Sequence, residues 1–178
     1  MILLRHGESY FNLHYGATRT DPGIADPPLT EGGRAQALAA AEVLRTRGIA
    51  RLIASPYTRA IETADIIADA LRLPLLIEPL VRERAAFTCD IGTPRTTLAR
   101  RWPQFSFNHL EERWWNHGVE DESALKDRCL CFRSAAARLP DWPTIAVISH
   151  WGFIRALTGE ALANGAHLVF DPTREPAL

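Results

Sequence analysis

Short apolar runs recur along this chain, and segments with helical spacing separate them. The runs expected to form strands are Met1–Leu4, Ile49–Ala54, Leu75–Ile77, Thr144–Ile148 and His167–Phe170. Strands that alternate with helices favour a parallel sheet, because each helix carries the chain back to the edge where the next strand begins. We therefore expect an α/β fold, a three-layer sandwich in which helices cover both faces of a mainly parallel central sheet.

The first two expected helices have recognisable beginnings. Thr30 is a candidate N-cap for a helix that ends at Gly48 and carries apolar residues at helical spacing, namely Leu38, Ala41 and Leu44. Ser55 is a candidate N-cap for the next helix, and Pro56 suits its first position. The apolar face expected for this second helix consists of Ala60, Ile61, Ala64, Ile67, Ala68 and Leu71.

The second half of the chain is less regular. Residues 82–118 are rich in aromatic side chains without a clear period, so we expect them to form a lid or a substrate wall. An acidic start at residues 120–122 predicts a helix that continues toward Pro140, and a short helix is expected after Gly152. A length of 178 residues is typical of one domain, expected over residues 1–178.

Charge and cysteine content exclude several classes of function. The chain has 20 basic and 21 acidic residues, so its net charge of −1 predicts no nucleic-acid partner and no affinity for anionic membranes. The apolar runs are too short to span a bilayer, and no signal peptide is recognised. Three cysteines form no spaced disulfide or zinc framework, which favours a cytoplasmic location.

Reactive side chains follow three of the expected strands. Arg5 and His6 follow the first strand, Ser55 with the nearby Arg59 follows the second, and Ser149 with His150 follows the strand that ends at Ile148. The carboxyl ends of parallel strands meet at one edge of a sheet, where ligands gather. Two arginines and two histidines in such a place predict a phosphate pocket, because guanidinium groups bind phosphate oxygens bidentately.

Several ordered motifs carry a family resemblance. They are Leu4-Arg5-His6-Gly7-Glu8-Ser9 with Asn12, Pro28-Leu29-Thr30 with Gly32, Ser55-Pro56 followed by Arg59-Ala60 and Thr63-Ala64, Glu83, Glu122-Ser123, and Ser149-His150-Trp151-Gly152. In this order they resemble the histidine phosphatase superfamily, which includes phosphoglycerate mutases. The resemblance implies the same α/β sandwich and a phosphate pocket lined by Arg5, His6, Asn12, Arg59, Glu83 and His150. Trp151 departs from the small residue common in the family, so the pocket is expected to be narrower there.

The resemblance also implies a reaction. A neutral His6 attacks a phosphomonoester to form a phosphohistidine, while the arginines, Asn12 and a protonated His150 hold the phosphoryl oxygens. Glu83 protonates the leaving oxygen and then activates water, although Glu8 and Glu78 are alternative carboxylates. The expected substrate is a small phosphorylated molecule, the product is inorganic phosphate, and no metal or cofactor is required.

Two other functions are kept as alternatives. One is a phosphoglycerate mutase-type phosphotransferase, which is disfavoured because such mutases carry longer insertions around the substrate. The other is a non-catalytic phosphate-binding or scaffold protein, which is disfavoured because all six pocket residues are present. The structural alternatives for single residues are a core histidine at His6, a surface charge at Arg5 and an exposed helix residue at Arg59. Among the remaining residues, Trp114–Trp115 with its flanking histidines is expected to pack, and Cys129 and Cys131 are expected to be small buried residues.

Overall fold

The computed structural model describes residues 1–174, and the last four residues of the expected 1–178 domain lie outside this range. Its centre is a five-stranded sheet with strand order β3-β2-β4-β1-β5. The strands are β1 (Ile2–Arg5), β2 (Arg51–Ala54), β3 (Leu75–Ile77), β4 (Ile145–Ser149) and β5 (His167–Val169). Strands β1 to β4 run parallel, whereas β5 pairs with β1 in the antiparallel direction. The prediction of a mainly parallel sheet is confirmed.

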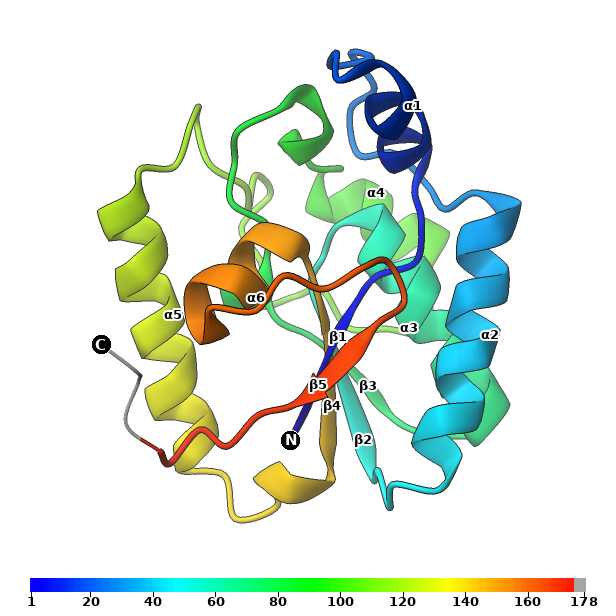
Figure 1. Cartoon of the computed structure of the whole chain (residues 1–178), viewed down its shortest axis with the longest axis vertical. Coiled ribbons are helices and arrows are strands. Elements are labelled where there is room, and N and C mark those ends of the chain that lie inside the picture. Colours follow the sequence, from blue (N-terminus) through cyan, green and yellow to red (C-terminus); the bar gives the residue numbers. More distant parts are fainter. Residues whose placement is uncertain (175–178) are drawn as a thin grey trace.

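Helices cover both faces of the sheet, as Figure 1 shows. The helices on one side are α2 (Glu31–Arg45) and α3 (Thr58–Leu71), and those on the other are α5 (Glu122–Ala137) and α6 (Trp151–Thr158). Successive side chains of a strand point to opposite faces of the sheet, so they pack in two separate hydrophobic cores. Leu4 packs with the side chains of α2 and α3, whereas its neighbour Leu3 packs with those of α5 and α6. The expected three-layer sandwich is therefore present.

Two further α-helices were not predicted. Helix α1 (Tyr10–Thr18) begins at the N-cap Ser9, whose side chain forms a reciprocal capping box with Asn12. Helix α4 (Arg95–Arg101) lies within the segment expected to be irregular. Three short 3₁₀ turns complete the elements of the described chain: η1 (Pro79–Val81), η2 (Thr88–Asp90) and η3 (Trp142–Thr144). Much of the segment 91–118 packs on the core beside α3, through Leu98, Trp102, Phe107, Leu110 and Trp114.

Some local predictions are wrong. Helix α3 begins at Thr58 with Tyr57 as its N-cap, so Ser55 and Pro56 belong to the turn before it. The Ser55 hydroxyl is instead hydrogen-bonded to His150.

The predicted apolar face of α2 is also partly wrong. Leu38 is 54% exposed, because Ala37, Ala40, Ala41 and Leu44 form the buried face of this helix. Cys129 is buried as expected, but Cys131 is exposed on the opposite side of α5.

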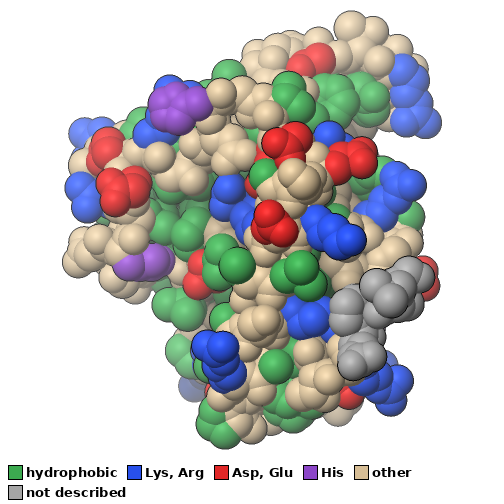
Figure 2. All heavy atoms as spheres, turned by 90° about the vertical axis from the view of Figure 1, so that its left-hand side faces the viewer, with side chains coloured by type: hydrophobic (Ala, Val, Ile, Leu, Met, Phe, Trp, Pro, Cys, Tyr) green, Lys and Arg blue, Asp and Glu red, His purple; other side chains and the backbone are tan. Residues whose placement is uncertain are grey.

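The surface carries charges of both signs. Figure 2 shows the face on the left of Figure 1, where acidic and basic side chains are interspersed with small apolar areas. This mixture agrees with the net charge of −1. Within residues 1–174, no helix combines the length and the apolar character that crossing a membrane requires.

Candidate active site

The two histidines of the sequence motifs lie side by side because their strands are neighbours. Arg5 at the end of β1 is paired in register with Ser149 at the end of β4, so His6 and His150 leave the sheet together. Their ring centroids are 4.9 Å apart. Both side chains are buried, with exposed fractions of 2% and 0%. The predicted convergence at the strand ends is present.

A single hydrogen bond orients the imidazole of His6. Its Nδ1 lies 2.7 Å from the carbonyl oxygen of Gly7, and because a carbonyl can only accept, Nδ1 carries the proton. The pKa of His6 lies well below its ordinary value, chiefly because burial disfavours the charged ring and also because Arg59 and Arg5 are close. The ring is therefore neutral, and its Nε2 lone pair is free.

The turn that carries this carbonyl depends on the close approach of two glycines. A Cβ atom on Gly7 would collide with the backbone of Gly33, at the start of α2. The N–H of Gly7 donates to the hydroxyl of Thr63 on α3, at 3.1 Å. Any side chain at residue 7 would therefore displace the carbonyl that holds His6.

His150 lies beside His6 and is held by two neighbours. Its Nε2 is 2.7 Å from the Ser55 hydroxyl, and its ring meets Tyr57 edge-on at 5.3 Å. Burial, followed by the nearby Arg59, places the pKa of His150 well below its ordinary value. In the ligand-free site the ring is therefore neutral, and its buried Nδ1 has no partner among the described residues. The protonated His150 expected during the reaction, with a phosphoryl group bound, stays a prediction.

Arg59 lies in the first turn of α3 and is only 3% exposed. Its guanidinium donates to the carbonyl of Cys89 at 2.9 Å and forms an ion pair with Asp90 at 3.1 Å. The other carboxylate oxygen of Asp90 accepts from the backbone N–H groups of Ala86 and Phe87. Asp90 thus connects Arg59 to the loop that follows Glu83.

Arg5 and Asn12 approach the same space from β1 and α1. Arg5 donates through Nη1 to the carbonyl of Leu162 at 2.8 Å, while its buried Nε has no partner among the described residues. The amide oxygen of Asn12 accepts from the Ser9 N–H and from Asn164 Nδ2. These bonds leave the Nδ2 group of Asn12 as its donor for a ligand.

Glu83 follows η1 and faces the N-terminus of α6. Its two carboxylate oxygens accept from the N–H groups of Gly152 and Phe153, both at 3.1 Å, and one also accepts from Arg84. A Cβ atom on Gly152 would collide with the carboxylate, so only glycine allows this approach. The pKa of Glu83 is raised, first by burial and then by the nearby Asp90.

These groups meet at a cavity of about 560 Å³. Its lining includes five of the six predicted site residues, namely Arg5, His6, Asn12, Arg59 and Glu83. His150 lies beside His6 but does not border the cavity. Glu8 and Glu78, the alternative acids, do not border it either, because Glu8 accepts from Thr30 and Glu78 caps η1.

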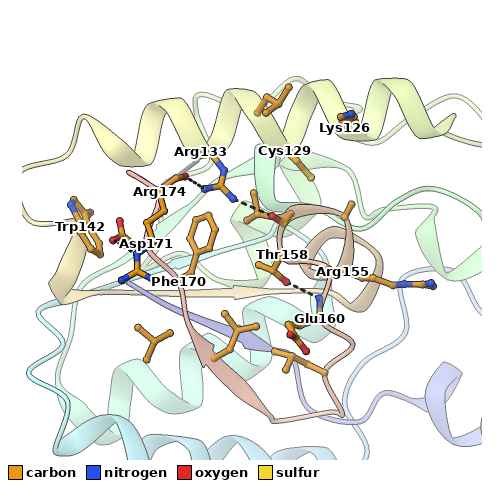
Figure 3. Close-up of a pocket in the computed structure, with 17 residues that line it drawn as sticks. Lys126, Cys129, Arg133, Trp142, Arg155, Thr158, Glu160, Phe170, Asp171 and Arg174 are labelled. Atoms are coloured by element: carbon orange, nitrogen blue, oxygen red, sulfur yellow. Dashed lines mark hydrogen bonds and ion pairs between the residues drawn. The ribbon is translucent and has the colours of Figure 1, made fainter. Parts of the chain in front are cut away.

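A larger cavity of about 990 Å³ lies between α5, α6 and β5. Figure 3 shows its lining, where Arg133 of α5 donates to the carbonyl of Arg174. Arg155, Glu160 and Asp171 also border this cavity, but none of the predicted site residues does. The candidate active site is therefore the smaller cavity at the strand ends.

Comparison with known proteins shows the family of the chain. The model of the histidine phosphatase superfamily (branch 1) matches residues 1–173. The chain belongs to this superfamily. The predicted fold class and family are thus confirmed, together with the prediction of an enzyme of the histidine phosphatase kind.

Individual relatives of this superfamily are similar over most of the chain. A glucosyl-3-phosphoglycerate phosphatase of Mycolicibacterium vanbaalenii is 29% identical over 177 residues, which cover 91% of this chain and 73% of the relative. A protein of Enterobacter sp. named "Probable phosphoglycerate mutase GpmB" is 44% identical over 161 residues, or 84% of this chain and 68% of the relative. The native structure of a mycobacterial glucosyl-3-phosphoglycerate phosphatase superposes with a TM-score of 0.61 at 25% identity, covering 88% of this chain and 76% of that one.

Two residues that border or support this candidate site were missed by sequence reasoning. Asp90 lies in a segment that matches no motif, and Asn164 lies in the loop before β5, where its amide donates to the carbonyl of His6. By contrast, Trp114 is buried in the core with Trp115 packed against it, so the predicted packing is confirmed for the two tryptophans, whereas the flanking His109 and His117 are exposed. Within residues 1–174, no three His, Cys, Asp or Glu side chains are grouped as a metal ion would require.

Proposed function

We propose that this protein hydrolyses a phosphomonoester through a phosphohistidine formed on His6. One observation carries the proposal: the neutral imidazole of His6 has its Nδ1 proton bonded to the carbonyl of Gly7, which leaves the Nε2 lone pair free at a cavity lined by four arginines, Arg5 and Arg59 among them. A histidine in this state is a nucleophile at neutral pH. A core histidine would be expected to have both ring nitrogens engaged by protein groups.

In the first step, Nε2 of His6 forms a bond to phosphorus as the bond from phosphorus to the leaving oxygen breaks. The positive charge that develops on the imidazole is stabilised by the Gly7 carbonyl at Nδ1. Arg5 and Arg59 bind the phosphoryl oxygens, and the Nδ2 group of Asn12 donates a further hydrogen bond. His150 lies beside His6, and a bound phosphate dianion favours its protonation, so its positive charge adds to the electrostatic stabilisation of the phosphoryl group.

Glu83 is the proposed acid and base of the reaction. Its raised pKa favours the protonated carboxyl, which gives its proton to the departing oxygen. The resulting carboxylate then takes a proton from the water that attacks phosphorus. This second step breaks the bond between phosphorus and Nε2 and releases inorganic phosphate.

A phosphotransferase of the mutase type is the second candidate, and the name of the Enterobacter relative favours it. It would share the first step and differ only in the acceptor, a hydroxyl in place of water. A labelled phosphomonoester, incubated with an excess of unlabelled phosphoglycerate, distinguishes the two. Label released as inorganic phosphate supports the phosphatase, whereas label transferred to the phosphoglycerate supports the mutase.

The direct test is phosphate release from a panel of phosphorylated metabolites, with the His6→Ala protein as the blank. The name of the Mycolicibacterium relative makes a glucosylated phosphoglycerate one member of this panel. Alkaline quenching, which preserves the acid-labile bond between phosphorus and nitrogen, followed by mass spectrometry should detect a phosphoryl group on the peptide that contains His6. Turnover without this adduct, together with equal turnover by His6→Ala, would contradict the proposed intermediate.

We place the reaction in the cytoplasm, which the free thiols of Cys89, Cys129 and Cys131 support.

A further inference from the structure

Four aromatic rings border the cavity in addition to the polar groups of the site. Phe11 and Tyr15 come from α1, Phe87 comes from the loop before η2, and Trp151 is the first residue of α6. We call these four residues the aromatic wall. They border the same cavity as Arg5, His6 and Arg59, so a molecule with its phosphate at His6 would extend its remaining atoms along them.

Three of these rings support one another. The ring centroids of Phe11 and Phe87 lie 5.4 Å apart, those of Tyr15 and Phe87 lie 5.3 Å apart, and Phe11 stacks on Tyr15 at 5.2 Å. Phe11 is nearly buried by these contacts, yet Phe87 remains 43% exposed. A ring that is held in place by neighbours but uncovered at a cavity is suited to stacking against a ligand.

Trp151 presents a second ring at the cavity. It is 40% exposed, and the guanidinium of Arg155 lies 4.9 Å from its ring centroid. This cation–π contact restrains the indole from the next turn of the helix. Because residue 151 directly follows His150, this ring is close in sequence to the groups that hold the phosphate.

The polar groups of the cavity distinguish an aromatic partner from a sugar. A polyol needs side-chain acceptors for its hydroxyls, yet the oxygens of Asn12, Glu83 and Asp90 are already engaged by protein donors. The other charged residues of the lining are Arg19 and Arg84, which can only donate. Aromatic faces without free carboxylate or amide acceptors favour an unsaturated, planar group.

We propose that the substrate is a phosphomonoester whose leaving group carries an aromatic ring close to the ester oxygen, and that Phe87 and Trp151 bind this ring. This inference rests on the proposed phosphatase function for the role of the phosphate. It also assigns Trp151, which replaces the small residue expected in the family motif, as a specificity-determining residue.

The test compares benzyl phosphate with methyl phosphate. Both release alkoxide-type leaving groups, so a preference for the benzyl ester reports binding of the ring. We expect the parent protein to favour benzyl phosphate in kcat/KM by at least about tenfold, a typical contribution of ring stacking. Phe87→Ala and Trp151→Ala should each reduce this ratio several-fold. Tyr10→Ala is the matched control, because Tyr10 is equally exposed at 42% but does not border the cavity.

Binding of non-hydrolysable phosphonates separates this inference from the proposed function. Calorimetry should show that benzylphosphonate binds about tenfold more tightly than methylphosphonate, and that the advantage is reduced in Phe87→Ala and Trp151→Ala. Equal binding of the two phosphonates would overturn the aromatic substrate class, even if both esters are hydrolysed. Preferential binding without hydrolysis of either ester would support the ring site and contradict the phosphatase. Thermal melting of each variant checks that the loop and α6 remain folded.

Discussion

The floor of the cavity and its aromatic wall are built in different ways. The floor is lined by His6 and Arg59, and we include in it His150, whose ring packs beside that of His6 without bordering the cavity. These residues follow buried strands or begin a helix, and none is more than 3% exposed. In the wall, Phe87 and Trp151 are about two-fifths exposed and come from a loop and from the first position of a helix. The comparison indicates that the sheet fixes the chemistry, while peripheral segments set which leaving group fits.

The largest loss of activity is expected from a substitution in the floor. Replacing His6 by Ala removes the nucleophile, so kcat/KM should fall by at least about 10⁴-fold, as it does when a covalent catalyst is removed. The loss should be equal for aromatic and simple alkyl phosphates, because the change does not touch the wall. Steady-state kinetics and thermal melting should be measured together.

The matched control is His14→Ala, because His14 is an exposed histidine of α1 outside the cavity lining. It should retain the activity of the parent protein. Activity of His6→Ala within tenfold of the parent would show that the floor does not act through a phosphohistidine. If His6→Ala lost activity only toward aromatic substrates, the floor and the aromatic wall would not have the separate roles in chemistry and specificity that we assign to them.

A smaller effect is expected for the acid. Glu83→Gln should slow phosphohistidine formation from an alkyl phosphate by about 10²- to 10⁴-fold, because an alkoxide needs a proton to leave. It should slow the reaction of p-nitrophenyl phosphate only mildly, because that leaving group is stable as an anion. Single-turnover rates isolate this step. Glu78→Gln is the control, and an equal loss for both substrates would exclude Glu83 as the acid.

The same contrast explains what the sequence could predict. The strands, the two faces of helices and five of the six residues at the cavity follow from apolar periodicity and from motifs anchored to strand ends. His150 was predicted at the pocket, but its ring is fully buried beside that of His6 and does not border the cavity. Positions tied to regular hydrogen bonding are set by local sequence, so patterns within a few residues suffice.

The remaining parts depend on contacts distant in sequence. Asp90 pairs with Arg59 across 31 residues, and Asn164 reaches His6 across 158. No local sequence pattern predicts such pairs, because Asp90 and Asn164 resemble ordinary loop residues in the sequence. Helix α1 was missed for a related reason: only Phe11 among its residues is buried, so it has no apolar stripe to recognise.

The floor should also be the pH-sensitive part of the fold. The folded protein holds His6 and His150 with pKa values well below the ordinary 6.5, so below about pH 6.5 the unfolded chain binds more protons. Stability is therefore present above this pH and is lost as the pH falls, by up to about 1.4 kcal/mol per pH unit for each histidine. Urea unfolding near pH 7 and pH 5.5 measures the change.

His150→Gln should remove about half of this pH dependence, because one of the two buried imidazoles is gone. His14→Gln should leave the dependence unchanged, since His14 is exposed. A parent protein whose stability is flat between these pH values would mean that the histidines of the floor accept protons without unfolding. The buried, neutral state assigned to His6 would then need revision.

The smallest effect is expected at Asp90, where the floor and the wall are joined. Its carboxylate pairs with Arg59 and also binds the backbone N–H of Phe87, so it places a negative charge beside the site for a phosphate dianion. Asp90→Asn removes this charge and frees the Arg59 guanidinium, so inorganic phosphate should inhibit about tenfold more strongly, the result of roughly 1.4 kcal/mol of relieved repulsion. Inhibition constants for phosphate measure this directly, with Asp65→Asn as the control away from the cavity. Weaker inhibition by phosphate in Asp90→Asn would mean instead that Asp90 serves mainly to hold Arg59 in place. In that case the preference for benzyl over methyl phosphate should fall as well, because the loop that carries Phe87 would lose its connection to Arg59 through Asp90.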